Sequence, residues 1–212
     1  SAAAGDADEL RSDYNLLIAL HRIAPEDLRV AQPPMREWQR LGHPLPVYFT
    51  FAELRDAADV FPIEFHRMEG SRVVLYGRDP FESISISDQN LRHQTEYELR
   101  SKLIQLRRLY IPASGSATRL RDLMVDSLSS FAMLFAPVLL LHGQDAPVLK
   151  HDIVRATVKS LGLDGAVFER VFALREGAAP GEREADELFA SYIAQIERVI
   201  EAVDRLDTSN GR

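Results

Sequence analysis

The spacing of apolar residues changes near residue 87, and this change constrains the fold more than any other feature of the sequence. Beyond that point, mostly apolar positions recur three and four residues apart, which places them on one stripe of an α-helix. The first such stripe is Leu91, Thr95, Leu99, Leu103, Leu106 and Tyr110. The second is Leu120, Leu123, Met124, Leu128, Phe131, Leu134 and Phe135, and the last is Leu188, Tyr192, Ile196, Val199, Val203 and Leu206. These stripes predict an all-α helical bundle over residues 87–208.

Proline and glycine divide this region into five helical segments. A turn is expected at residues 112–116. Pro137 is predicted to kink the second helix, because its ring removes an N–H group and clashes with the preceding turn. Gly162 separates two shorter helices, expected at 148–161 and 166–174. Short connections of this kind are typical of neighbouring helices in a bundle.

The first third of the chain alternates strand-like and helix-like segments instead. The apolar runs at 15–20 and 45–49 predict two strands, and the period-two alternation at 60–68 predicts a third. A helix is expected to begin at Pro25 and to break or restart at Pro33–Pro34. We therefore expect a small mixed-sheet α/β domain over residues 1–80, which gives the whole chain an α+β fold class.

A second helix is expected directly after the strand at 45–49. Thr50 and Glu53 have the spacing of a capping box, which predicts a short helix through Ala58. The boundary with the bundle is expected between Gly77 and Ser87, where the period of the pattern changes.

The composition excludes several classes of protein. The 212 residues include no cysteine, which excludes a disulfide scaffold, a zinc–thiolate site and cysteine catalysis. The net charge of −7 argues against general nucleic-acid binding. The longest mostly apolar run, residues 131–141, is shorter than the roughly twenty residues that span a bilayer. We expect a cytoplasmic protein without a membrane span, and a natural chain that begins before Ser1.

The segment Ser12-Asp13-Tyr14-Asn15-Leu16 carries the main candidate for chemistry. Residues two apart at the start of a strand emerge on the same face, so Asp13 and Asn15 are expected to lie side by side. Two carboxylates in this arrangement hold magnesium ions that orient a nucleoside triphosphate. Only Asp13 is a carboxylate here, and Asn15 offers a neutral amide oxygen. Glu64 is the candidate for a further ligand, if its strand lies beside the first. The alternative reading is an ordinary turn at Ser12–Asp13 and a solvated Glu64.

Ser1 with Gly5, followed by Ser12-Asp13-x-Asn15-Leu16, resembles the Gly-Ser…Ser-Asp-x-Asp-Leu signature of the DNA polymerase beta-like nucleotidyltransferase superfamily. The order of a small α/β domain and a helical bundle resembles its bacterial two-domain members. The resemblance implies transfer of a nucleoside monophosphate from a triphosphate to a hydroxyl acceptor. It further implies that Ser1 and Asn15 contact the nucleotide, while Asp13 and Glu64 bind magnesium and are catalytic.

Three departures from the signature bear on activity. No glycine precedes Ser1, the second aspartate of the signature is replaced by Asn15, and the third acid is Glu64. Replacing a metal-bridging carboxylate with a neutral amide removes a full negative charge from a dication site. We therefore expect a nucleotidyltransferase-like protein whose catalysis is weakened or lost.

Charge is distributed unevenly along the bundle, and it leaves a second function open. Residues 89–121 carry a balance of +5, and residues 176–207 carry −6. One reading is a basic wall facing a triphosphate and an acidic wall facing a cationic acceptor. The other is that two solvated helix faces attract each other across the bundle. The alternative function is a non-catalytic interaction module that uses its helices to pair with a second copy, as a homodimer, or with another protein.

Overall fold

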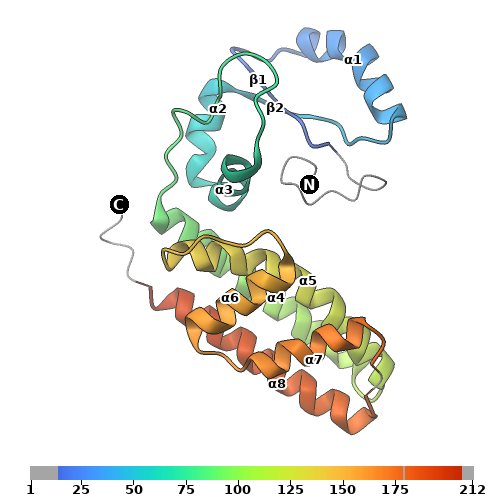
Figure 1. Cartoon of the computed structure of the whole chain (residues 1–212). Helices are drawn as coiled ribbons and strands as arrows, with labels where there is room; N and C mark the ends of the chain where they lie inside the picture. The colour runs from blue at the N-terminus through green and yellow to red at the C-terminus, as the bar shows by residue number, and fades with distance from the viewer. Residues whose placement is uncertain (1–13, 179, 207–212) are drawn as a thin grey trace. The chain divides into compact units, whose positions relative to one another are not determined.

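The computed structural model describes residues 14–178 and 180–206, and the chain divides into two compact units (Figure 1). The first unit comprises Ser1–Ser87 and the second Asp88–Arg212. The described residues are mostly helical and contain one two-stranded parallel sheet, which agrees with an α+β class. Each unit is described by itself.

The first unit begins with a strand–helix–strand motif. Strand β1 (Leu17–Leu20) and strand β2 (Val47–Thr50) pair in parallel, with Leu17 opposite Val47 and Leu20 opposite Thr50. Parallel neighbours require a crossover connection, and helix α1 (Pro25–Arg40) supplies it. The first two predicted strands are therefore confirmed, whereas the sheet in the described residues is purely parallel and not mixed.

Helix α1 does not break at Pro33–Pro34, contrary to the sequence prediction. It is assigned as one helix across both prolines, and it changes direction along its length in Figure 1. None of its residues is buried. Water can therefore bind the carbonyl groups that the prolines leave without a helical donor, so the chain stays helical at a modest cost.

The capping box at the end of β2 is confirmed. The Thr50 amide donates to Glu53 Oε2 at 2.7 Å, and the Glu53 amide donates to Thr50 Oγ1 at 3.1 Å. These bonds start helix α2 (Phe51–Asp56), which continues into the 3₁₀ turn η2 (Ala57–Asp59). The two exchanged bonds satisfy backbone donors that a helix start leaves open.

The third predicted strand, at 60–68, is wrong: helix α3 (Pro62–Ser71) occupies that segment. Pro62 stands at the first helical turn, where its missing N–H group costs no helical bond. The helix buries Ile63 and Phe65 and packs Met68 against the same core, a spacing of three that a helix places on one side. A short apolar run fits either period, and here its packing selects the helix.

The core of the first unit lies on one face of the sheet. Its buried centre is Leu54, Ala58, Phe65 and Phe81. Around it pack Leu17, Ala19, Phe49, Ala57, Met68, Ile84 and Ile86. The cluster therefore joins β1, β2, α2, α3 and the segment that follows α3.

An ion pair closes the loop after α3. The Arg72 guanidinium binds Asp79 with two nitrogens, at 2.6 to 3.0 Å, and lies 5.2 Å from the centre of the Phe81 ring. Asp79 Oδ1 also accepts the Phe81 amide at 2.9 Å. The hydrogen bonds from Arg72 hold the pKa of Asp79 below its usual value.

The second unit is the predicted helical bundle. Its helices are α4 (Asp88–Ala113), α5 (Ala117–Leu141), α6 (Lys150–Leu161), α7 (Gly165–Arg175) and α8 (Glu182–Asp204). Helix α5 is central, since it contacts each of the other four. It remains one helix through Pro137, and Gly162 ends α6 in a left-handed conformation with φ of 60°.

Helix α5 is long and apolar enough to cross a membrane by length and composition. Half of its most apolar window is buried inside the unit, and core helices of soluble proteins satisfy the same criterion. The apolar run at residues 131–141 is thus the second half of a longer apolar helix, and this helix packs against the other four helices of the unit.

Aromatic rings fill the centre of the bundle. Tyr192 is fully buried, and its ring packs edge-on against Phe131 and Phe168 at centroid distances of 6.4 and 6.1 Å. Its hydroxyl lies 3.1 Å from the Ser127 hydroxyl, which also bonds to the Met124 carbonyl. Burial raises the pKa of Tyr192 far above its usual value, so the phenol stays neutral.

Candidate functional site

The residues expected to bind the nucleotide are only partly described. Ser1 and Asp13 lie outside the described residues. Asn15 is exposed and is separated from β1 only by Leu16, whose carbonyl accepts the Val47 amide at 3.0 Å. Asn15 therefore stands directly before the paired part of the parallel sheet.

Glu64 lies on a helix and not on a strand, which corrects its expected surroundings. It is exposed in the first turn of α3, next to Phe65. Phe65 packs in the same cluster as Leu17 and Ala19, and its ring lies edge-on to the Phe49 ring of β2 at 6.5 Å. Helix α3 therefore contributes to the core on the face of the sheet that carries these odd-numbered residues. Glu64 lies on this helix with its own side chain exposed.

The oxygens of these side chains suit magnesium chemically. Asn15 offers an amide oxygen and Glu64 a carboxylate, and hard oxygen ligands are those that Mg²⁺ prefers. Among residues 14–178 and 180–206, no group of three or more His, Cys, Asp or Glu side chains could hold a metal. The predicted ligand Asp13 lies outside the residues to which this finding applies.

Aromatic side chains pack against Tyr14, the residue before Asn15, and the sequence pattern did not predict this cluster. The His43 ring lies 5.1 Å from the Tyr14 ring and 4.3 Å from the Trp38 ring. Trp38 Nε1 donates to the Pro44 carbonyl at 2.7 Å, which fixes the indole at the start of β2. His43 Nδ1 is buried without a hydrogen-bond partner among the described residues. This aromatic cluster of Tyr14, Trp38 and His43 adjoins the amino-terminal edge of the sheet.

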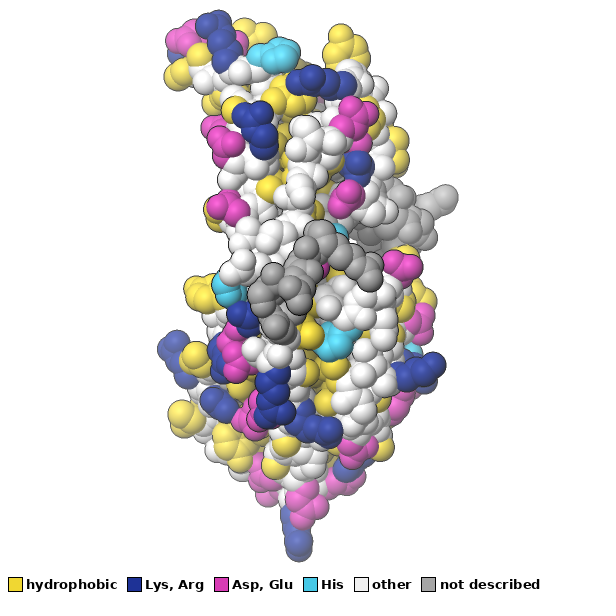
Figure 2. Space-filling model, turned by 90° about the vertical axis from the view of Figure 1, so that its left-hand side faces the viewer, with side chains coloured by type: hydrophobic (Ala, Val, Ile, Leu, Met, Phe, Trp, Pro, Cys, Tyr) yellow, Lys and Arg dark blue, Asp and Glu magenta, His cyan; other side chains and the backbone are white. Residues whose placement is uncertain are grey.

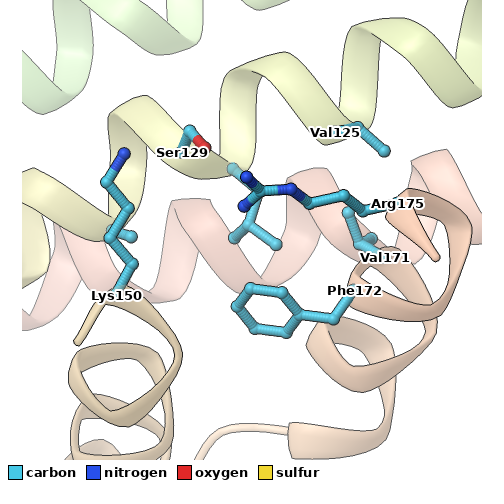
Figure 3. Close-up of a pocket in the computed structure, with 8 residues that line it drawn as sticks. Val125, Ser129, Lys150, Val171, Phe172 and Arg175 are labelled. Atoms are coloured by element: carbon cyan, nitrogen blue, oxygen red, sulfur yellow. The ribbon is translucent and has the colours of Figure 1, made fainter. Parts of the chain in front are cut away.

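The bundle contains a recess between α5, α6 and α7 (Figure 3). Figure 3 shows the Arg175 guanidinium reaching over the Phe172 ring toward Ser129, with Lys150 on the other side. The cavity measures about 10 Å³, which is room for about one water molecule. A nucleotide is far larger than this recess. Lys150, Arg175 and Ser129 therefore do not form a nucleotide-binding pocket here.

A larger hollow of about 200 Å³ lies between α7 and α8. Its two charged lining residues, Arg170 and Glu184, bind each other at 2.9 Å, and its other lining residues are apolar. Its chemistry therefore offers nothing that would orient a phosphate or a metal ion.

Basic residues of α4 form ion pairs with acidic residues of α8. This agrees with the prediction that the two charged helix faces attract each other across the bundle. Arg107 of α4 binds Glu197 of α8 at 2.6 Å, and Arg100 lies 3.4 Å from Asp204. Figure 2 shows basic and acidic side chains interspersed over this unit. Exposed pairs of this kind contribute little to stability, about 0–1 kcal/mol each. Two of the basic residues of α4 are thus paired with acidic residues of α8.

Glu96, a partly buried carboxylate within α4, is also paired with basic residues. Glu96 accepts Arg100 at 2.7 Å and Arg92 at 3.0 Å. Burial raises the pKa of Glu96, but the hydrogen bonds and charges of the two arginines lower it by more. Glu96 therefore stays ionised and paired within α4, and its lowered pKa makes it a weaker proton acceptor than an ordinary glutamate.

Comparison with protein-family models, with curated proteins and with solved structures gives no significant match. The resemblance to the nucleotidyltransferases accordingly depends on the motif at Ser12–Leu16 and on the order of the two units.

Proposed function

We propose that this chain binds a magnesium-bound nucleoside triphosphate at the amino-terminal edge of the β1–β2 sheet, as a nucleotidyltransferase-like protein. The observation that supports the proposal is the position of Asn15. The Ser-Asp-x-Asn pattern directly precedes the first strand of a parallel strand–helix–strand unit. Residues two apart at the start of a strand share a face, so the proposal places Asp13 beside Asn15 at this end of the sheet.

Four side chains are proposed to contact the magnesium ion or the triphosphate. Asp13 and Glu64 supply carboxylate oxygens to magnesium, and Asn15 supplies a neutral oxygen. Ser1 contacts the phosphates. The bound ion neutralises phosphate charge and orients the triphosphate for attack by a hydroxyl acceptor. With Asn15 in place of a carboxylate, the site holds the ion weakly, so binding is retained better than transfer.

The aromatic cluster adds a contact for the base. Tyr14 is 54% exposed and lies between Asp13 and Asn15 in the sequence. Aromatic rings stack with nucleobases, a contact worth about 1–3 kcal/mol per base in nucleic-acid complexes. The His43 ring packs against both Tyr14 and Trp38 and so supports the exposed Tyr14 ring from within. Tyr14 is therefore proposed to contact the base while the oxygen ligands hold the phosphates.

Titration calorimetry with ATP, in the presence and absence of magnesium, tests the proposal. The chain, with any native residues that precede Ser1, is compared with Asp13→Ala and with Asp145→Ala, which removes an exposed acid in the bundle. Magnesium-dependent binding that Asp13→Ala abolishes and Asp145→Ala leaves intact is the expected result. Equal binding by all three proteins, or binding that ignores magnesium, would overturn it. GTP, CTP and UTP in the same titration separate base preference from phosphate binding.

A further inference from the structure

Helix α4 carries a second apolar stripe that faces away from the bundle core. Tyr97, Ile104 and Ile111 are 69%, 57% and 74% exposed. They are seven residues apart, so they share one side of the helix over about 21 Å. The buried side of α4, through Leu99 and Leu106, faces the opposite way. Three large apolar side chains in a heptad row on an open face are typical of a helix that receives another helix.

The charged residues three and four positions from the members of this stripe on α4 are all basic. On a helix surface the neighbours of a residue are three and four positions away. For Ile104 these are Arg100, Ser101, Arg107 and Arg108. Arg100 and Arg107 already pair with carboxylates of α4 and α8 on one side, whereas Arg108 has no ion pair among the described residues. The positions three and four away from Tyr97 and Ile111 likewise carry no carboxylate.

We propose that the outward face of α4, formed by Tyr97, Ile104, Ile111 and Arg108, docks an acidic amphipathic helix of another protein. The apolar row supplies the contact, and the arginines select flanking Asp or Glu side chains. A second copy of this chain is disfavoured, because two α4 helices packed through Ile104 would bring their arginines together. The proposal is independent of nucleotide binding and concerns the second unit only.

Two synthetic helical peptides of three heptads serve as probes. Both carry Leu at the a and d positions; one carries Glu at the flanking e and g positions and the other carries Lys there. Fluorescence anisotropy of each labelled peptide is measured against the full chain, Ile104→Ser, Arg108→Glu and the control Val148→Ser. Val148 is 59% exposed in the same unit but lies outside α4, so it matches the change at Ile104.

The Glu peptide is expected to bind in a saturable manner. Ile104→Ser and Arg108→Glu should each raise its Kd at least tenfold, and Val148→Ser should leave the Kd unchanged. Far-UV circular dichroism should show equal helicity, since both variants alter exposed positions. Equal binding of the Lys peptide, no saturable binding, or indifference to Ile104→Ser would overturn the proposal. Sedimentation that shows a dimer lost in Ile104→Ser would assign the face to a second copy and overturn it as well.

Discussion

The buried hydrogen bond between Tyr192 and Ser127 allows a quantitative test of the bundle. The Ser127 hydroxyl bonds to the Met124 carbonyl, so the Tyr192 hydroxyl donates its proton to Ser127 Oγ. The two partners are therefore not equivalent. Ser127→Ala leaves a fully buried phenol hydroxyl without an acceptor, which costs about 1–3 kcal/mol. Tyr192→Phe removes the buried donor itself and costs only about 0.5–1.5 kcal/mol.

The double variant separates this account from a simple loss of contacts. In Ser127→Ala with Tyr192→Phe, no unsatisfied donor remains, so the loss of stability should not exceed that of Ser127→Ala alone. Urea unfolding followed by far-UV circular dichroism measures the three free energies. Trp38 is the only tryptophan and lies in the first unit, so its fluorescence shows whether that unit is unaffected. Additive effects, or a Ser127→Ala cost below about 0.5 kcal/mol, would refute the assigned direction of the bond.

Three further predictions concern stability. Thr50→Ala should lower the stability of the first unit by about 1 kcal/mol, measured by Trp38 fluorescence in urea, because the capping box is lost. Since Arg72 lowers the folded-state pKa of Asp79, this group stabilises the unit above its unfolded pKa and ceases to do so as pH falls through the folded value. Asp79→Asn should therefore flatten the loss of stability below about pH 4. Phe135→Ala in the bundle core should cost about 3–5 kcal/mol in circular-dichroism melts; a smaller loss than in Thr50→Ala would contradict the assigned core.

The bundle could be predicted because its signals are long and repeated. A stripe such as Leu91 to Tyr110 spans five helical turns or more, and only a helix places all its members on one side. The ends were also marked locally: Ser116 accepts the Arg119 amide at the start of α5, and Gly162 takes the left-handed conformation at the end of α6. Local geometry and global packing agree at these positions, so sequence reasoning succeeds there.

The first unit was harder to predict because its segments are short. Alternation from Phe61 to Phe65 covers too few residues to distinguish period two from a helix, and tertiary packing decided the outcome. Pro33 and Pro34 were expected to interrupt α1, but that helix is not buried, so its free carbonyl groups are open to water. In both segments the local sequence pattern alone did not decide the secondary structure. Packing decided it at residues 61–65, and exposure to solvent decided it at Pro33–Pro34.

Some parts of the candidate sites can likewise be found in the sequence, and others form only when the chain folds. The spacing of Asp13 and Asn15 is local and visible in the sequence. The aromatic cluster is not, because Tyr14 and His43 meet only after α1 has crossed over to bring β2 beside β1. The outward row on α4 could have been found from its seven-residue spacing, but the core stripe on the opposite side, through Leu99, dominates the same pattern.

Titration of ATP into Asn15→Asp with magnesium present tests the nucleotide proposal most directly. The substitution restores the second carboxylate of the signature and adds one negative charge next to the proposed ion. Charge–charge interactions at such distances are worth about 1–4 kcal/mol between the limits of water and a protein surface. The account predicts magnesium-dependent binding at least about tenfold tighter than that of the unaltered chain. Unchanged or weaker binding in Asn15→Asp would show that this edge of the sheet does not hold a magnesium-bound triphosphate.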